Sequence, residues 1–196
     1  ADGMVFVGSC NNNVYALNAA TGAIVWSFPT LGWVISSPAV VDGVVYVGSN
    51  DTNVYALNAA TGAFMWSRAL GGYVDSSPAV AGGVVYVGSF DYHVYALNAT
   101  TSAKIWNYTT GYYVESSPAV VGGVVYVGSD DKKVYALNAA TGSLIWKNTT
   151  IGEVDSSPGV ADGKVYVGSW NGYGLSGSGA TVYCLNASTG AFIWTY

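Results

Sequence analysis

Three carboxylates recur at one place in a repeating sequence. Asp75, Glu115 and Asp155 lie 40 residues apart, and each directly precedes a Ser-Ser-Pro tripeptide. Carboxylate oxygens are ligands for hard cations, so one hypothesis is a shared cation site, with Ca²⁺ as the metal. The alternative is three solvated carboxylates that lie too far apart to share an ion. A third chemistry, acid–base hydrolysis of glycosides, needs one proton-retaining and one ionised carboxyl group. Nothing in the sequence separates these three residues in that way.

Few residues are available for other chemistries. His93 is the only histidine, and it is expected in a solvent-exposed loop without the Gly-X-Ser-X-Gly motif of a nucleophilic serine. Cys10 and Cys184 lie far apart in the sequence, which excludes Cys-X-X-Cys and zinc-finger sites. A net charge of −5 with six Lys and Arg residues argues against nucleic acid. No apolar run approaches the roughly 20 residues of a membrane helix.

The chain is built from a repeat of 40 residues. The pentapeptide Val-Tyr-Ala-Leu-Asn, or Val-Tyr-Cys-Leu-Asn in its last copy, begins at Val14, Val54, Val94, Val134 and Val182. Within the second unit, residues 36–40, 44–47, 54–57 and 63–66 are rich in β-branched and aromatic residues. Asp-Gly, Asn-rich and Thr-Gly segments between these runs are turn signals. Four short antiparallel strands per unit, named A to D here, predict the blade of an all-β propeller.

We expect a single β-propeller domain over residues 1–196, with blade units at approximately 1–30, 31–70, 71–110, 111–150 and 151–196. The chain is 12 residues short of five complete units with an 8-residue insertion. The shortfall corresponds to Pro29–Val40, a D–A loop and an A strand, so the first blade should lack its innermost strand. An edge of this kind invites pairing with a flanking segment or with another copy of the chain. The chain is therefore expected to be part of a longer repeat protein or to be completed in an assembly.

The turn before strand D carries a family resemblance. The segment Ala16–Gly22, followed by Trp26, resembles the tryptophan-docking repeat Ala-X-Asp-X-X-Thr-Gly-X-X-X-Trp of PQQ-type propellers, in which the Trp stacks between neighbouring blades. The docking positions are Trp26, Trp66, Trp106, Trp146 and Trp194. Asn replaces the family's Asp throughout, Ser102 replaces a turn Gly and Cys184 replaces a docking Ala. At Ser102 the turn should be strained if φ is positive.

That family includes quinoprotein dehydrogenases, outer-membrane assembly lipoproteins and cell-surface proteins without a known reaction. The dehydrogenases hold PQQ against a disulfide between adjacent cysteines, with a calcium shell and a catalytic Asp. This sequence has no adjacent cysteines. The resemblance therefore implies the fold without the quinoprotein active site, and neither PQQ nor dehydrogenase activity is expected.

Comparison between the units points to one face of the propeller. The A–B and C–D turns barely change, whereas the B–C and D–A loops, which share one face, vary strongly. Uniform turns are what packing requires, and recognition is usually built on loops that vary. The candidate binding face for a protein or glycan carries the aromatic residues Trp33, Tyr73, Phe90, Tyr92, Tyr113 and Trp170. The alternative is that the sequences of loops without a packing role vary freely and have no binding function. Asp75, Glu115 and Asp155 should ring the channel mouth on this same face.

Five Asn-X-Ser/Thr sequons fit an extracellular or cell-surface protein, such as those of archaeal surfaces, with the periplasm as an alternative. Asn50, Asn107 and Asn148 are the glycosylation candidates, because Asn98 and Asn186 begin turns. A disulfide between Cys10 and Cys184 would clasp a closed ring, whereas Cys184 alone would be a small buried thiol.

The expected function is a non-catalytic extracellular scaffold for binding or assembly. The alternatives are a carbohydrate-active enzyme that uses the acidic ring, and a purely structural subunit of a surface layer or filament.

Overall fold

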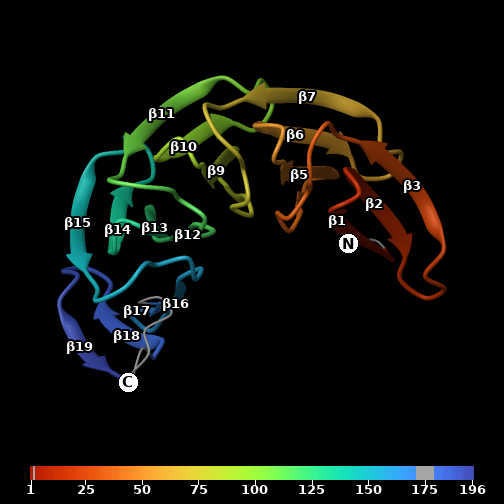
Figure 1. Cartoon of the computed structure of the whole chain (residues 1–196). Coiled ribbons are helices and arrows are strands. Elements are labelled where there is room, and N and C mark those ends of the chain that lie inside the picture. Colours follow the sequence, from red (N-terminus) through yellow and green to blue (C-terminus); the bar gives the residue numbers. More distant parts are fainter. Residues whose placement is uncertain (2, 171–178) are drawn as a thin grey trace.

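The computed structural model describes residues 1, 3–170 and 179–196. Within these residues the chain forms 19 strands in five antiparallel sheets, which follow one another along an open arc (Figure 1). The first sheet has three strands, in the order β1-β2-β3, and the other four sheets have four strands each. Both the all-β propeller fold and the missing innermost strand of the first blade are confirmed.

The strands are short and nearly identical from sheet to sheet. The first sheet consists of β1 (Met4–Ser9), β2 (Asn13–Asn18) and β3 (Ile24–Pro29). The second and third sheets consist of β4 (Ala39–Val41), β5 (Val44–Gly48), β6 (Asn53–Asn58) and β7 (Phe64–Ala69), then β8 (Ala79–Ala81), β9 (Val84–Gly88), β10 (His93–Asn98) and β11 (Lys104–Thr109). The last two consist of β12 (Ala119–Val121), β13 (Val124–Ser129), β14 (Lys133–Asn138) and β15 (Leu144–Thr149), then β16 (Gly159–Ala161), β17 (Lys164–Ser169), β18 (Thr181–Asn186) and β19 (Phe192–Thr195).

Backbone conformation explains the two uniform sets of turns. Asp42 and Gly43 both have positive φ, 51° and 75°, as a primed two-residue hairpin between strands A and B requires. In the C–D turn, the Asn58 side-chain oxygen accepts hydrogen bonds from the backbone N–H groups of Ala60 and Thr61, both at 3.0 Å. Gly62 closes that turn with a φ of 71°. Ser102, at the same place in the third unit, has a φ of 59° and is therefore strained.

The core lies between neighbouring sheets. The docking tryptophan of each of the first four sheets is buried, and its indole N–H donates to an alanine carbonyl of the next sheet, as from Trp26 to Ala59 at 2.9 Å and from Trp146 to Ala187 at 2.8 Å. The interface is dense, because a Cβ added to Gly62 would lie 2.7 Å from the Trp26 ring. Each of Trp26, Trp66, Trp106 and Trp146 is thus buried and hydrogen-bonded to the next sheet.

Trp194 differs from the other four docking tryptophans. Its side chain is 46% exposed, against 8–9% for the others. Trp194 lies on β19 in the last sheet of the arc, and among the described residues no further sheet covers it. Trp194 therefore departs from the packing between blades that the family resemblance implies.

The Ser-Ser-Pro tripeptides join the sheets at the inner edge of the arc, beside strands β4, β8, β12 and β16. Ser77 donates its backbone N–H to the hydroxyl of Ser117 at 2.8 Å. The hydroxyl of Ser76 donates to the backbone carbonyl of Ser116 at 3.0 Å, and it accepts the N–H of Gly88 in its own sheet. The repeated Ser-Ser pair therefore links each inner strand to the next one.

Cys10 and Cys184 are free thiols, exposed and buried respectively. They belong to the first and last sheets, and the open arc keeps those sheets from being neighbours (Figure 1). The disulfide considered from the sequence is not formed, and Cys184 is the small buried thiol of the alternative interpretation. Among the described residues there is also no helix that is long and apolar enough to cross a membrane.

Candidate binding face

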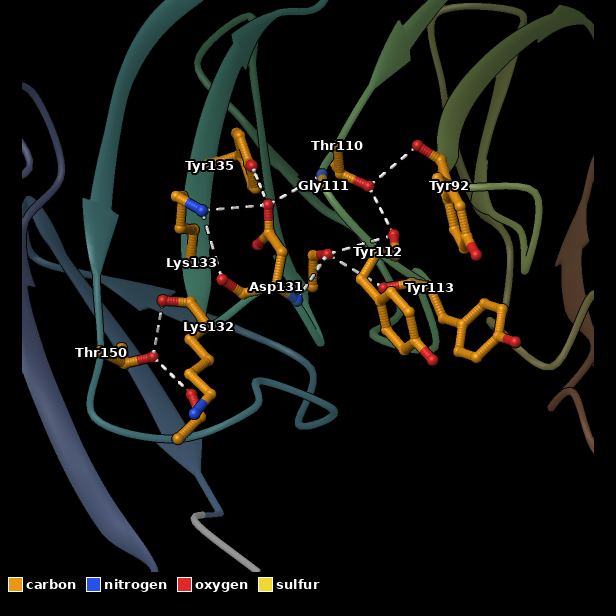
Figure 2. Close-up of polar contacts among 12 residues, drawn as sticks. Tyr92, Thr110, Gly111, Tyr112, Tyr113, Asp131, Lys132, Lys133, Tyr135 and Thr150 are labelled. Atoms are coloured by element: carbon orange, nitrogen blue, oxygen red, sulfur yellow. Dashed lines mark hydrogen bonds and ion pairs between the residues drawn. The ribbon is translucent and has the colours of Figure 1, made fainter.

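In three of the five sheets an aspartate holds the B–C loop to the D–A loop that leaves the preceding sheet. One carboxylate oxygen of Asp131 accepts hydrogen bonds from the hydroxyl of Tyr135 and from the backbone N–H of Gly111 (Figure 2). The same pair of contacts recurs at Asp51, with Tyr55 at 2.7 Å and the N–H of Leu31 at 2.8 Å. It occurs a third time at Asp91, with Tyr95 and Gly71. We call this arrangement the aspartate latch.

The latch has electrostatic consequences at Asp51. Burial of its carboxyl group raises the pKa, but hydrogen bonds from Tyr55, Leu31 and Asn53 to the charged form outweigh this effect, so the pKa of Asp51 lies below its ordinary value. Burial and the adjacent carboxylate raise the pKa of the Tyr55 phenol. The latch is therefore a phenol donating to an ionised carboxylate.

The latch differs in the first and last sheets of the arc. In the first sheet Asn11 replaces the aspartate, and its side-chain N–H donates to the hydroxyl of Tyr15 at 2.7 Å. In the last sheet the hydroxyl of Tyr183 accepts the N–H of Ile151 directly, at 3.0 Å. Comparison of the units does not reveal this role at once, because most side chains of the B–C loops differ from unit to unit. The signal was present, since Asp recurs at the second loop position in three units.

The backbone of the B–C loops is constant although their side chains differ. The third loop residue has a left-handed φ in all four tight loops: 66° at Asn12, 74° at Thr52, 71° at Tyr92 and 66° at Lys132. A threonine hydroxyl ties the neighbouring loop to this bend, as Thr110 donates to the carbonyls of Tyr92 at 2.8 Å and Tyr112 at 2.7 Å (Figure 2). The face therefore consists of a fixed backbone that presents different side chains.

Aromatic side chains from two D–A loops and one B–C loop gather on this face. The aromatic cluster consists of Tyr73, Phe90, Tyr92, Tyr112 and Tyr113. The Tyr113 ring lies 4.7 Å from Phe90, 5.3 Å from Tyr92 and 4.3 Å from Tyr112, measured between centroids. Tyr73 is 51% exposed, Tyr112 42% and Tyr92 38%. Four of the aromatic residues named from the sequence thus come together, and Tyr112 joins them.

The two tryptophans named from the sequence lie outside this cluster of stacked rings. Trp33 is 56% exposed and, with Tyr73, lines a cavity of about 360 Å³ that Asn12, Leu31, Gly32 and Asn50 complete. Trp170 exchanges two backbone hydrogen bonds with Glu153, both at 2.8 Å. Most of the enlarged loop that follows Trp170 lies outside the described residues.

Carboxylates lie beside the aromatic cluster. The acidic cluster consists of the three residues named from the sequence and two more: Asp75, Glu115, Asp130, Glu153 and Asp155. Burial, followed by the charges of Asp155, Asp75 and Glu153, raises the pKa of Glu115. Burial, the charges of Asp155, Glu115 and Glu153 and a hydrogen bond with Asp155 raise the pKa of Asp130 to about 8. Asp130 and Glu153 were missed because they occur in one unit only.

The acidic cluster does not have the geometry of a metal site. In the part of the chain that the structure describes, no three His, Cys, Asp or Glu side chains lie close enough together to hold an ion. Asp75, Glu115 and Asp155 precede strands β8, β12 and β16, which belong to three successive sheets. The Ca²⁺ hypothesis at these residues therefore has no support from geometry.

The remaining candidates have local structural roles. His93 is half-buried rather than exposed, and its Nδ1 lies 2.8 Å from the carbonyl oxygen of Asp91 in its own loop. Among the three glycosylation candidates, Asn107 is exposed, whereas Asn50 is half-buried. The Asn148 amide donates to the carbonyl of Gly190 at 2.7 Å, so a glycan on that nitrogen would disturb a contact between two sheets.

Comparisons with known proteins agree on the fold. The solved structure of BamB from Moraxella catarrhalis superposes with a TM-score of 0.77 at 19% identity, over 100% of this chain and 73% of that one. The computationally designed Ika8 protein superposes with a TM-score of 0.86 at 16% identity, over 100% of this chain and 59% of the designed one. A search of curated protein sequences gives no match. The family model described as outer membrane protein assembly factor BamB matches residues 1–112 and 94–196. Because these two matches together span the whole chain, the protein belongs to this family of PQQ-type propeller repeats.

Proposed function

We propose that this chain is a non-catalytic scaffold for binding or assembly that contacts a protein partner through the face formed by its D–A and B–C loops. The observation that carries the proposal is the aromatic cluster. Five aromatic rings pack against one another in loops, and three of them remain 38–51% exposed. Large aromatic side chains in partly exposed, rigid positions are the usual anchors of protein interfaces.

The framework beneath the cluster supports this proposal. Aspartate latches and threonine hydrogen bonds fix the loops before a partner arrives, so little conformational entropy is lost on binding. The family description, outer membrane protein assembly factor, and the resemblance to BamB agree with a role in assembly. They also favour the cell envelope, at the outer surface or in the periplasm.

The carboxylates do not favour the enzyme alternative. Asp130 and Asp155 share a hydrogen bond, whereas the two carboxyl groups of glycosidases stand about 5–9.5 Å apart to accommodate the sugar. A direct carboxyl–carboxylate contact leaves no room for a glycosidic bond between these two groups.

Association at the end of the arc is a second candidate, and the exposed indole of Trp194 favours it. The four equivalent indoles each donate to an alanine carbonyl of the next sheet. A further sheet on this face, from a flanking segment or from another copy of the chain, would bury the Trp194 ring in the same way. Sedimentation of the 196-residue chain with and without Trp194→Ala tests self-association. A monomer at all concentrations would remove the second copy as the occupant.

The main proposal is tested by unbiased selection. A random dodecapeptide library is selected on the wild-type chain, and the recovered peptides are measured against a triple variant, Tyr73→Ser, Tyr112→Ser and Tyr113→Ser. The matched control carries Ile105→Ser, Ile145→Ser and Ile193→Ser, which are 46–47% exposed on the outer strands β11, β15 and β19. We expect binding to be lost in the tyrosine variant and kept in the control. If no recovered peptide depends on the tyrosines, the proposal is wrong.

A further inference from the structure

The aromatic and acidic clusters form one continuous surface. Tyr73 and Asp75 flank the fully buried Val74, and Tyr113 and Glu115 flank the fully buried Val114. Residues two apart in an extended segment point the same way, so each of these loops presents a tyrosine and a carboxylate together. Asp130 joins the two clusters through its backbone, because its N–H donates to the carbonyl of Tyr113 at 3.0 Å.

The negative charge on this surface has no fixed partner. Among the described residues the ion pairs are His93 with Asp91 and Lys133 with Asp131, and neither involves the acidic cluster. Lys132 lines a cavity of about 360 Å³ together with Asp130 and Glu153, but no cation lowers the pKa of Asp130 or Glu115. Every charge that acts on these two groups is another carboxylate. The surface is therefore partly desolvated and negatively charged, and no cationic side chain among the described residues pairs with it.

Among protein side chains, the arginine guanidinium group is the one that can bind both clusters. A guanidinium plane stacks on tyrosine and phenylalanine rings, and its N–H fork donates to carboxylates. A lysine ammonium is a more strongly hydrated point charge, so it gains less from the rings. Acidic segments and nucleic acids would be repelled by the ionised carboxylates of the acidic cluster.

We propose that this face binds arginine-containing polypeptide segments, with guanidinium groups stacked on the aromatic cluster and paired with the acidic cluster. The inference rests on the proposed function and specifies the chemistry of the partner. Tyr113 is the central contact, because it touches three other rings and borders Asp130. Glu115 and Asp155 supply charge on the acidic side.

The test uses three labelled dodecapeptides that carry four arginines, four lysines or four citrullines at the same positions in a Gly-Ser background. Citrulline keeps the planar shape and loses the charge. Fluorescence anisotropy with the 196-residue chain should give the tightest binding for arginine, weaker binding for lysine and binding at least about tenfold weaker for citrulline. Raising the salt concentration should weaken the arginine complex.

Two variants and a control locate the site. Glu115→Gln with Asp155→Asn should weaken the arginine peptide about tenfold, and Tyr113→Ser should weaken it about fivefold. The control, Asp42→Asn with Asp162→Asn, removes the same charge from hairpin turns on the opposite face, where asparagine tolerates the positive φ of 51° and 49°. It should change the affinity less than about twofold. Circular dichroism and thermal melting establish that all variants are folded.

Three outcomes would overturn the inference. The citrulline peptide could bind as tightly as the arginine peptide, the loop-face variants could bind like the control, or no peptide could bind. Library peptides that depend on the tyrosines but lack arginine would leave the scaffold proposal standing while this inference falls. A library without tyrosine-dependent peptides would contradict the scaffold proposal itself.

Discussion

The carboxylate of Asp51 accepts the hydroxyl proton of Tyr55 at 2.7 Å, and the same oxygen accepts the backbone N–H of Leu31 from the loop that leaves the preceding sheet. One side chain thereby joins two sheets and fixes the position of one loop of the binding face relative to the next. The latch is repeated at Asp91 and Asp131. These two latches hold the loops that carry the aromatic cluster. The stability of the face and its capacity to bind are therefore physically coupled.

Removal of this carboxylate should be costly. Asp51→Ala leaves the hydroxyl of the buried Tyr55 and the Leu31 N–H without their acceptor, and we expect a loss of about 2–3 kcal/mol in the free energy of unfolding. Asn11→Ala is the matched control, because this exposed residue occupies the same loop position in the first sheet. It should cost less than about 0.5 kcal/mol. Urea denaturation followed by tryptophan fluorescence measures both, and equal effects would contradict the latch.

The lowered pKa of Asp51 also predicts how the stability of the chain depends on pH. Because its pKa in the folded state lies below its ordinary value, the ionised form is preferred more strongly in the folded chain than in the unfolded chain. The resulting stability is present above the unfolded pKa of about 3.9 and is lost as the pH falls through the folded value. Asp51→Asn should therefore show a smaller loss of stability below pH 4 than the wild type. Urea midpoints between pH 2 and 6 measure this loss, and curves that remain parallel would contradict the prediction.

Asp130 should affect the pH dependence of stability in the opposite direction from Asp51. Its pKa is raised to about 8 in the folded chain, so the folded state holds a proton that the unfolded chain releases at about pH 3.9. The associated stability is fully present below pH 4 and is lost as the pH rises through about 8. Asp130→Asn should therefore be more stable than the wild type at pH 9, with little difference at pH 4. Thermal melting at both pH values measures this, with Asp42→Asn in an exposed turn as the control.

The fold could be predicted from the sequence because each repeat carries its own turn chemistry. Asp42-Gly43 and the Asn58–Gly62 turn are local signals, and the four buried tryptophans follow from their spacing. The candidate binding face was harder to predict from the sequence. Tyr73, Phe90, Tyr92 and Tyr113 could be named as exposed aromatics, but their contact depends on how successive sheets rotate around the arc. Asp130 could not be identified as part of the acidic cluster, because the folded chain brings it to Asp155 from another sheet.

The exposure of Trp194 predicts an asymmetry between two equivalent residues. Trp146→Ala removes a buried ring and its hydrogen bond to Ala187, and we expect a loss of about 3–5 kcal/mol in the free energy of unfolding. Trp194→Ala removes a ring that is 46% exposed, and we expect a loss of less than about 1.5 kcal/mol. Guanidinium denaturation of both variants at a low protein concentration provides the comparison. A cost at Trp194 as large as that at Trp146 would mean that another sheet covers this ring in solution.

Ser102 offers a change that should stabilise the chain. It holds a left-handed φ of 59° where the other units have glycine at 71–72°. Because Gly62 lies beside Trp26 and Gly142 beside Trp106, the repeat implies that Ser102 lies beside Trp66. Ser102→Gly removes the backbone strain and the crowding, which outweighs the added flexibility of the unfolded chain, so the free energy of unfolding should rise by about 1 kcal/mol. The reverse change, Gly62→Ser, places a Cβ 2.7 Å from the Trp26 ring and should destabilise the chain. Chemical denaturation of both variants decides the matter, because a neutral or destabilising Ser102→Gly would show that the third turn has relaxed around its serine.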